Sequence, residues 1–282
     1  MVWGRLSSMA VLAMFTFFVS ITSIAQPYCA DANFWRAPIP GDSLEYITEA
    51  NPHGRLNFDS LKILVWNVYK LGKAGILADL DFLTHQADLS LIQEGFLTKG
   101  LLNLACSRED LNFLMAKSFS DKGINAGVIT ASKENPIAAD YLKSPNTEPF
   151  SSIHKMTLAT YYEIPESEEK LLVLNIHGIN FVPHDHFVKQ INVVAQTIQV
   201  HSGPIIFAGD FNTYTSARLD FLIKKVSSLG LTQAKVKGAE YQGLLTLDHL
   251  FYRGLELVKS EALKHVKSSD HIPLFFEFKL DR

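Results

Sequence analysis

Acidic, amide and imidazole side chains follow short apolar runs at several places along this 282-residue chain. Each lies at or just beyond the end of such a run, where a strand would lead into a loop at the rim of a sheet. Side chains from distant parts of a chain can converge at such a rim. The candidate residues are Asn67, Glu94, His177, Asp210, Asn212, Asp248, Asp270 and His271.

Each of these residues, taken alone, has a structural explanation. Asp210 and Asn212 could form an Asx turn, and Asp270 and His271 could belong to a loop that leads into an edge strand. Taken together, the residues offer oxygen-rich ligands without cysteine, which suit a hard cation such as Mg²⁺ or Mn²⁺. The set therefore indicates a divalent-cation site.

Helical segments alternate with the apolar runs that would position these residues. Apolar residues at helical spacing predict an amphipathic helix over 185–201. A second helix is expected around 75–86, and a third between a cap at Thr215 or Ser216 and a stop at Gly230. Strands are predicted at 61–67, 89–94, 126–131, 156–164, 171–177, 205–208, 247–252, 256–263 and 273–278.

The order of these elements predicts the fold class. The polar segment 165–170 separates two strands and indicates an antiparallel hairpin. Strands interleaved with helices, together with at least one hairpin, favour an α/β sandwich with mixed sheets over a wholly parallel barrel.

Six motifs in chain order resemble those of the endonuclease/exonuclease/phosphatase superfamily, and in particular its uncharacterised exported bacterial members. The resemblance implies a deoxyribonuclease I-like fold: a four-layered sandwich of two mixed, largely antiparallel β-sheets flanked by helices, with the site at one rim. The motifs are Trp66-Asn67-Val68, Leu91-Ile92-Gln93-Glu94, Asn175-Ile176-His177, Gly209-Asp210-Phe211-Asn212, Leu247-Asp248-His249-Leu250-Phe251-Tyr252 and Ser269-Asp270-His271-Ile272-Pro273.

The same resemblance implies roles for the candidate residues. Glu94 would be the principal ligand of Mg²⁺ or Mn²⁺, with Asn67 and Asp270 nearby and able to share or hold a second ion. Asp210 and Asn212 would position or deprotonate the attacking water.

The two histidines would act on the phosphoryl group. His271, oriented by Asp248, would be the general base or would bind the phosphoryl oxygen, and His177 would stabilise or protonate the leaving group. Which imidazole does which job stays open.

The expected activity is metal-dependent hydrolysis of a phosphoester, with a phosphodiester in nucleic acid as the default substrate. A sphingomyelinase-like lipid phosphodiesterase or a phosphomonoesterase would use the same site. A catalytically silent secreted binding module is the alternative from another class. No stable protein partner is implied, and a monomer is expected.

Composition does not oppose a nuclease. The chain has a formal net charge of −3 and no block of five like charges, so no basic arm announces a tight nucleic-acid binder. An enzyme that only visits the phosphate backbone can rely on a few local cations and a bound metal.

The N-terminus predicts export. Residues 1–25 hold a single charge, an apolar run and a small-x-small ending, which is typical of a cleaved signal peptide. The protein would then be periplasmic or secreted, whereas an uncleaved segment would anchor it in a membrane. Residues 26–58 form an irregular lead-in segment, and residues 59–282 form the catalytic domain.

Two cysteines occur, Cys29 and Cys106. In an oxidising compartment they could form a disulfide that ties the lead-in segment to the domain. Two separate thiols are an equally good interpretation, because the sequence does not give the Cα separation that decides between them.

Overall fold

A computed structural model describes residues 43–48, 54–149, 151–236 and 247–281 of the chain. The predicted signal segment, Cys29 and much of the lead-in segment lie outside the described residues. In the part of the chain that the structure covers, no helix is long and apolar enough to cross a membrane.

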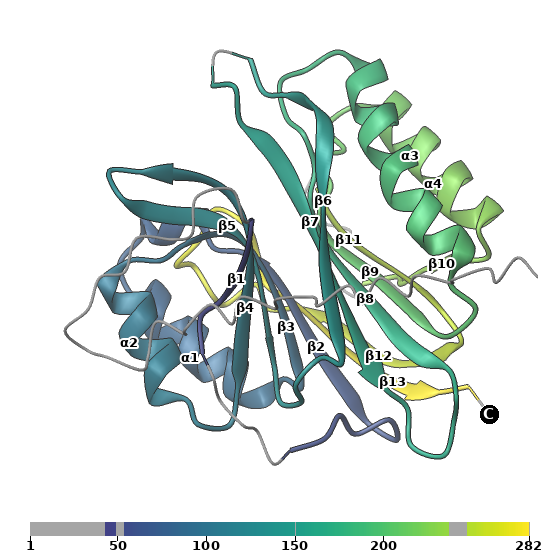
Figure 1. The fold of residues 1–282 in the computed structure, drawn as a ribbon, viewed down its shortest axis with the longest axis horizontal. Helices are drawn as coiled ribbons and strands as arrows, with labels where there is room; N and C mark the ends of the chain where they lie inside the picture. Colours follow the sequence, from purple (N-terminus) through teal and green to yellow (C-terminus); the bar gives the residue numbers. More distant parts are fainter. Residues whose placement is uncertain (1–42, 49–53, 150, 237–246, 282) are drawn as a thin grey trace, which may run out of the picture.

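Two β-sheets pack face to face (Figure 1). The seven-stranded sheet, called sheet A below, has the order β1-β4-β5-β3-β2-β13-β12, and the six-stranded sheet B has the order β10-β11-β9-β8-β7-β6. The strands of sheet A are, in that order, Leu44–Tyr46, Asn112–Asp121, Ile124–Ser132, Leu89–Phe96, Leu61–Asn67, Leu274–Leu280 and Leu255–Ala262. Those of sheet B are Thr232–Gln233, Asp248–Arg253, Ile205–Asp210, Lys170–His177, His154–Glu163 and Ala138–Thr147.

Helices cover the outer faces of both sheets and complete four layers (Figure 1). Helices α1 (Ile76–Gln86) and α2 (Lys99–Ser107) pack on sheet A, and α3 (His184–Val200) and α4 (Ser216–Ser228) pack on sheet B. A short helix η1 (Tyr69–Leu71) follows β2. The predicted four-layered α/β sandwich, with two mixed and largely antiparallel sheets, is confirmed.

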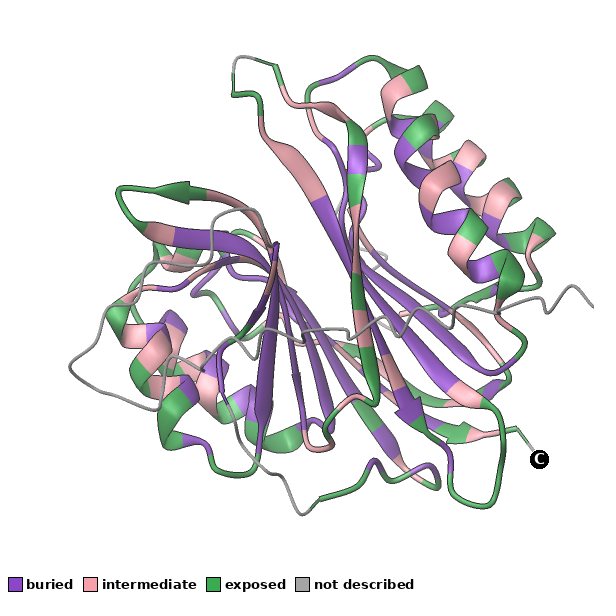
Figure 2. Cartoon of the chain, viewed as in Figure 1, coloured by how far each residue is buried: buried purple, intermediate pink, exposed green. Residues whose placement is uncertain are grey.

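Apolar residues fill the three interfaces between the layers, as the buried strand faces in Figure 2 show. The sheets meet through Leu91, Val173 and Phe276. Leu80 of α1 packs against sheet A, and Phe187 of α3 packs against sheet B. The two sheets form one core rather than two, because side chains from both contribute to the same central cluster.

Two βαβ units place the functional strand ends. Strands β2 and β3 pair in parallel and are joined by α1, and strands β8 and β9 pair in parallel and are joined by α3. Because parallel strands end at the same edge of a sheet, each unit delivers two strand ends to one edge.

The predicted helices and strands occur, with shifts of a few residues at their ends. The hairpin around 165–170 joins β7 and β8, Thr215 caps α4 through its side chain, and Gly230 follows the helix with a left-handed φ of 76°. The elements that were not predicted are β1, η1, β4, β6, β10 and α2. Strand β1 lies within the lead-in segment, where an irregular loop was expected, and pairs with β4.

Cys106 lies near the end of α2 and is disulfide-bonded. Its expected partner, Cys29, lies outside the described residues.

Candidate active site

Asp210 lies at the meeting point of the site, at the end of β9 in sheet B. Its Oδ2 accepts a hydrogen bond of 3.0 Å from Nδ2 of Asn67, which ends β2 in sheet A. The same oxygen lies 3.7 Å from Nε2 of His177 and 4.0 Å from Nε2 of His271. The carboxylate is buried. Side chains from both sheets therefore converge on one carboxylate oxygen.

Asn67 and His177 contact Glu94 as well as Asp210. Its Oε1 is 3.4 Å from the Asn67 amide nitrogen and 3.8 Å from His177 Nε2. Glu94 sits at an irregularity in the β3–β5 pairing and has a left-handed φ of 55°. Such a bulge redirects a side chain, and strain of this kind clusters at functional sites. The bulge turns Glu94 toward the edge where the strands end.

His271 and Asp248 form a close pair. The imidazole Nδ1 lies 2.7 Å from Asp248 Oδ2, so Asp248 fixes the ring. The backbone around His271 is held in turn, because Trp66 Nε1 donates to the His271 carbonyl at 3.1 Å and Ser269 Oγ donates to the Asn67 carbonyl at 2.7 Å. The loop before β13 is thereby attached to the end of β2.

The loops after β8 and β9 lie against each other. Asn212 has a left-handed φ of 52°, its backbone N–H donates to Asp210 Oδ1, and its Nδ2 donates to the Gly178 carbonyl at 2.8 Å. A Cβ at Gly178 would lie 2.4 Å from the Phe211 carbonyl oxygen, so only glycine allows this approach. Asn212 therefore joins the two loops.

Two buried residues outside the predicted set support these loops. Gln190 on α3 accepts from the Ile179 N–H and donates to the His177 carbonyl. Arg218 on α4 donates to three backbone carbonyls, those of Ile179, Asn212 and Val182. The one signal in the sequence is spacing, since Arg218 shares a helix face with apolar residues four and eight positions later.

The surroundings of Asp210 and His271 shift the pKa values of both side chains. Burial, with repulsion from Asp248, raises the pKa of Asp210 to about 7. Burial would lower the pKa of His271, but the carboxylates of Asp248, Asp210 and Asp270 outweigh it and raise this pKa to about 10. At neutral pH, His271 is therefore charged, and Asp210 holds its proton to a higher pH than an ordinary aspartate does.

His177 behaves in the opposite way. Burial, together with the positive charges of Lys155, His271 and Lys70, lowers the pKa of His177 well below its usual value. The imidazole is therefore neutral at neutral pH. Lys70 lies in η1, which follows β2, and Lys155 lies on β7.

Seven of the eight predicted residues are brought together, and Asp270 is the exception. It is exposed, and its carboxylate accepts from Ser269 Oγ at 3.3 Å. It still acts on His271 through its charge. Asn67 differs in another respect: its Oδ1 accepts from the Tyr69 N–H, so it presents a donor to the two carboxylates rather than a ligand oxygen.

The side chains of the site can be compared with those that a divalent cation requires. No group of three or more His, Cys, Asp or Glu side chains in the described ranges is arranged to hold a metal ion. Glu94 Oε2, however, is buried and has no hydrogen-bond partner within those ranges. Mg²⁺ keeps several waters and often takes only one or two carboxylates. The residues present therefore fit an ion of that type.

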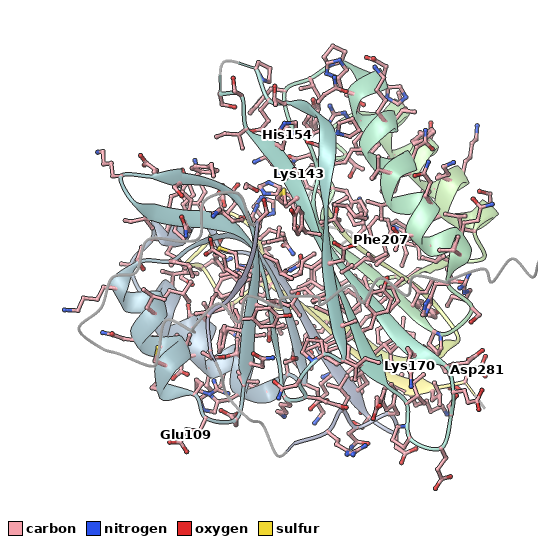
Figure 3. All side chains as sticks on the ribbon, in the orientation of Figure 1. Glu109, Lys143, His154, Lys170, Phe207 and Asp281 are labelled. Atoms are coloured by element: carbon pink, nitrogen blue, oxygen red, sulfur yellow. The ribbon has the colours of Figure 1, made fainter. Side chains whose placement is uncertain are left out.

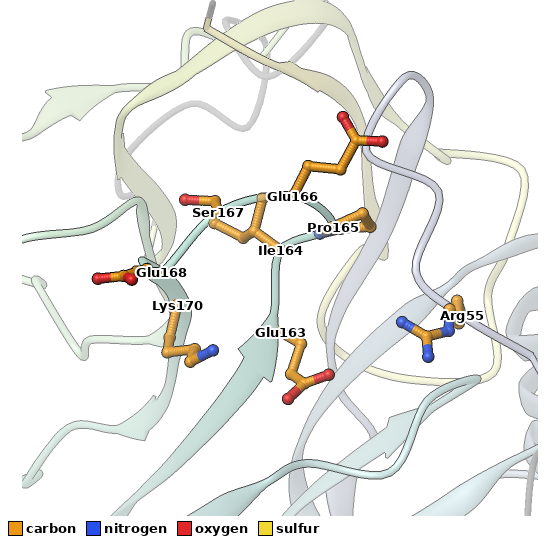
Figure 4. Close-up of a pocket in the computed structure, with 8 residues that line it drawn as sticks. All are labelled: Arg55, Glu163, Ile164, Pro165, Glu166, Ser167, Glu168 and Lys170. Atoms are coloured by element: carbon orange, nitrogen blue, oxygen red, sulfur yellow. The ribbon is translucent and has the colours of Figure 1, made fainter.

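Other features of the sequence lie away from this cluster. His249, next to Asp248 on β11, is buried, and its ring nitrogens contact Thr213 and Gln233. A surface pocket of about 390 Å³, lined by Arg55, Glu163 and Lys170 among others, lies at the β7–β8 turn, at the far end of β8 from His177 (Figure 4).

The convergence of these strand ends at the rim of a two-sheet sandwich defines a family. A model of the endonuclease/exonuclease/phosphatase family matches residues 64–271, well over half of the chain, and the protein belongs to this family. Membership supports a hydrolase of the phosphoesterase and nuclease type.

The chain is similar to particular proteins in sequence or in fold. A UPF0294 protein of Vibrio campbellii is 34% identical over 225 residues, which cover 78% of both chains. The crystal structure of an endonuclease/exonuclease/phosphatase from Beutenbergia cavernae superposes with a TM-score of 0.63 at 14% identity, covering 79% of this chain and 72% of that one. ANGEL2, described as a 2′,3′-cyclic phosphatase in complex with adenosine-2′,3′-vanadate, superposes with a TM-score of 0.60 at 16% identity, covering 85% of this chain and 98% of that one.

Proposed function

We propose that this protein is a divalent-metal-dependent phosphodiesterase that uses an activated water, with nucleic acid as its substrate. The observation that carries the proposal is the convergence of Asn67, His177 and His271 on Asp210 Oδ2, with Glu94 alongside. A cluster of this kind supplies a proton acceptor, a cation and a ligand carboxylate within a few ångströms.

Asp210 is the residue best suited to accept a proton from water. Its pKa of about 7 lets it be deprotonated in a useful fraction of molecules at neutral pH and still be basic enough to take a proton. Asn212 holds this carboxylate in place through its backbone N–H. In the predicted pair of roles, Asp210 is therefore the base and Asn212 the positioning residue.

His271 is suited to bind phosphoryl oxygen rather than to act as the base. The imidazole is charged up to about pH 10, because the neighbouring carboxylates stabilise the proton. A charged imidazole donates a strong hydrogen bond to an anionic oxygen. The neutral His177, on the other side of Asp210, can accept or relay a proton near the leaving group.

Glu94 would hold the divalent cation, through the carboxylate oxygen that has no partner among the described residues. When bound, such a cation polarises the phosphoryl group and offsets the charge that develops on it. Asp270, at the exposed mouth, could bind waters or a second ion.

The test is hydrolysis of a panel of phosphoesters by the purified protein, with Mg²⁺ or Mn²⁺ and with chelator. Supercoiled DNA, sphingomyelin vesicles, an artificial phosphodiester and an artificial phosphomonoester cover the candidate substrates. We expect cleavage of the phosphodiesters that chelator abolishes and that His271→Ala strongly reduces. Cleavage only of sphingomyelin or of the monoester would assign a different substrate, and no cleavage of any would favour a binding module.

We also propose that the protein is exported. The support is the apolar, nearly uncharged stretch in residues 1–25 with its small-x-small ending. Sequencing of the mature N-terminus after cell fractionation tests this: a start at Gln26 outside the cytoplasm is expected, whereas an intact Met1 in the membrane fraction would indicate an anchor.

A further inference from the structure

Two phenylalanines extend the inner face of sheet A beyond Glu94. Phe96 on β3 and Phe119 on β4 both pair in register with Ala126 of β5. Their rings meet edge to face at 5.6 Å between centroids. Ala126 lies two residues from Val128, which packs in the interface between the sheets, so Ala126 and the two rings face sheet B.

The two phenylalanine rings are not covered as the core is. Residues of the same face nearer the centre, such as Ala116 and Val128, are fully buried, whereas Phe96 and Phe119 are only half-buried. Figure 1 shows the β4–β5 and β6–β7 hairpins diverging toward their tips. The rings therefore lie where the sheets separate, and not in the packed core.

The opposite face, on sheet B, carries positive and polar groups. Lys143 of β6 is the register partner of Met156 of β7, and Met156 packs in the interface between the sheets, so Lys143 also faces sheet A. Its ammonium lies 5.7 Å from the centre of the Tyr141 ring. His154 lies two residues beyond Met156 on the same face, and Figure 3 shows both labelled residues on this hairpin.

Both sets of side chains begin next to the catalytic cluster. Phe96 is two residues from Glu94 on β3. On sheet B, the β7–β8 register pairs Thr157 with Ile176, which places Met156 opposite His177 and His154 one step further out. A chain lying between the hairpins would thus lead directly to Glu94 and His177.

We propose that the diverging inner faces bind an unpaired nucleic-acid strand, with a base stacked on the Phe96–Phe119 pair and a phosphate near Lys143. This proposal rests on the phosphodiesterase function proposed above and narrows its substrate. Aromatic rings bind exposed bases of any type through stacking, and lysines follow the backbone. A duplex offers no free base face to the rings, so single strands are the preferred class.

A hairpin tip argues against a lipid surface as the occupant. The β4–β5 turn consists of Lys122 and Gly123 and directly follows Asp121, the last residue of β4. Inserting an aspartate and a lysine into a bilayer is costly. The tip of the β4–β5 hairpin therefore favours an aqueous ligand over a membrane.

The experiment measures binding of a short fluorescent oligodeoxynucleotide, single-stranded or annealed, to the full-length protein in chelator. Stacking contributes about 1–3 kcal/mol per base, so Phe119→Leu or Phe96→Leu should weaken single-strand binding by about fivefold or more. Lys143→Gln should weaken it and reduce the slope of log affinity against log salt by about 1. Phe82→Leu on α1 and Lys224→Gln on α4 are matched exposed controls and should change neither quantity.

The proposal is supported if the wild type binds the single strand more tightly than the duplex and if the Phe96, Phe119 and Lys143 variants bind the single strand less tightly. The circular dichroism spectra of the variants should match that of the wild type. Equal affinity for the duplex, full affinity in those variants, or binding to sphingomyelin vesicles without binding to the oligonucleotide would overturn it. Hydrolysis of a small artificial phosphodiester by the wild type is measured in parallel. Activity on that substrate without strand binding would refute this inference and leave the proposed phosphodiesterase intact.

Discussion

Asp210 Oδ2 and His271 Nε2 lie 4.0 Å apart, and yet the surroundings of the two side chains have different effects on their protonation. Burial raises the pKa of Asp210 to about 7, whereas three carboxylates raise the pKa of His271 to about 10. Environments that separate two titrating neighbours in this way assign them different roles in acid–base chemistry. At the scale of single residues, the proposed site is thus a proton acceptor, Asp210, beside a charged imidazole, His271.

Asp248→Asn should lower the pKa of His271. Asp248 is the strongest of the groups that raise this pKa, both through its charge and through the 2.7 Å hydrogen bond. In the proposed function a charged His271 binds the phosphoryl oxygen, so activity should be lost as pH rises through the pKa of His271. The alkaline limb of the pH–rate profile should therefore move to lower pH in the variant, and an NMR titration of the imidazole should show the same shift. An unchanged alkaline limb would mean that His271 acts in another form.

Glu94→Gln should weaken binding of a divalent cation, because the amide removes the charge that attracts the ion. The melting temperature is the readout: Mn²⁺ should raise it in the wild type through preferential binding to the folded state. The rise should be lost or strongly reduced in Glu94→Gln. Glu109→Gln, at an exposed glutamate, is the control and should respond like the wild type. The same rise in the Glu94 variant would place the ion elsewhere.

At the scale of helices and strands, the site was largely predictable because it depends on where strands end. Apolar runs can be recognised locally, and polar residues that follow them must reach a sheet edge. The pattern therefore identified Glu94 and Asp210. Arg218 and Gln190 could not be identified in that way, because their hydrogen bonds reach loops more than ten residues away in most cases. The exposure of Asp270 likewise depends on the tertiary path of its loop.

Strand β6 was not predicted, and there is a physical reason for this. Strand β6 lies at the edge of sheet B, most of its residues are at least partly exposed, and it contains Pro145. Proline is tolerated on an edge strand, but it removes the signal of a central strand. For β4 and α2, the apolar residues and the Thr98 cap are local features of the sequence, so both elements were predictable from it.

Arg218→Met should destabilise the loops after β8 and β9. The change leaves the carbonyls of Ile179, Asn212 and Val182 buried without this donor, at a cost of about 3 kcal/mol or more in the free energy of unfolding. Urea denaturation measures that cost. Hydrolysis should fall as well, even well below the melting temperature, because His177 and Asp210 flank these loops. Lys224→Met on the same helix is the control, and equal stability of the two variants would contradict the assigned role.

At the scale of the whole molecule, a buried polar contact joins the two sheets next to the site. Gln93 Nε2 of sheet A donates to Asn175 Oδ1 of sheet B at 2.7 Å, and Asn175 Nδ2 donates back to the Ile129 carbonyl at 2.9 Å. Both side chains are fully buried. Gln93 directly precedes Glu94, and Asn175 lies two residues before His177. This contact therefore sets how the two halves of the site face each other.

Asn175→Ala should therefore reduce both stability and turnover. Losing the amide removes one of the two acceptors of Gln93 Nε2 and takes this donor from the Ile129 carbonyl, which should cost about 2–3 kcal/mol in the free energy of unfolding. Asn103→Ala on the exposed face of α2 should cost less than about 0.5 kcal/mol. Denaturant melts of the two variants measure the difference. A cost as small as that of the control would show that the sheets keep their alignment without this contact.

The most direct test of the whole account is turnover of an artificial phosphodiester in Mg²⁺ by Asp210→Asn, compared with Asp220→Asn at an exposed position on α4. The amide keeps the size of the buried side chain but cannot accept the proton of the attacking water. We expect Asp210→Asn to lose at least about 100-fold in kcat, and Asp220→Asn to match the wild type. Wild-type turnover in Asp210→Asn would contradict the claim that the groups converging on Asp210 form the active site.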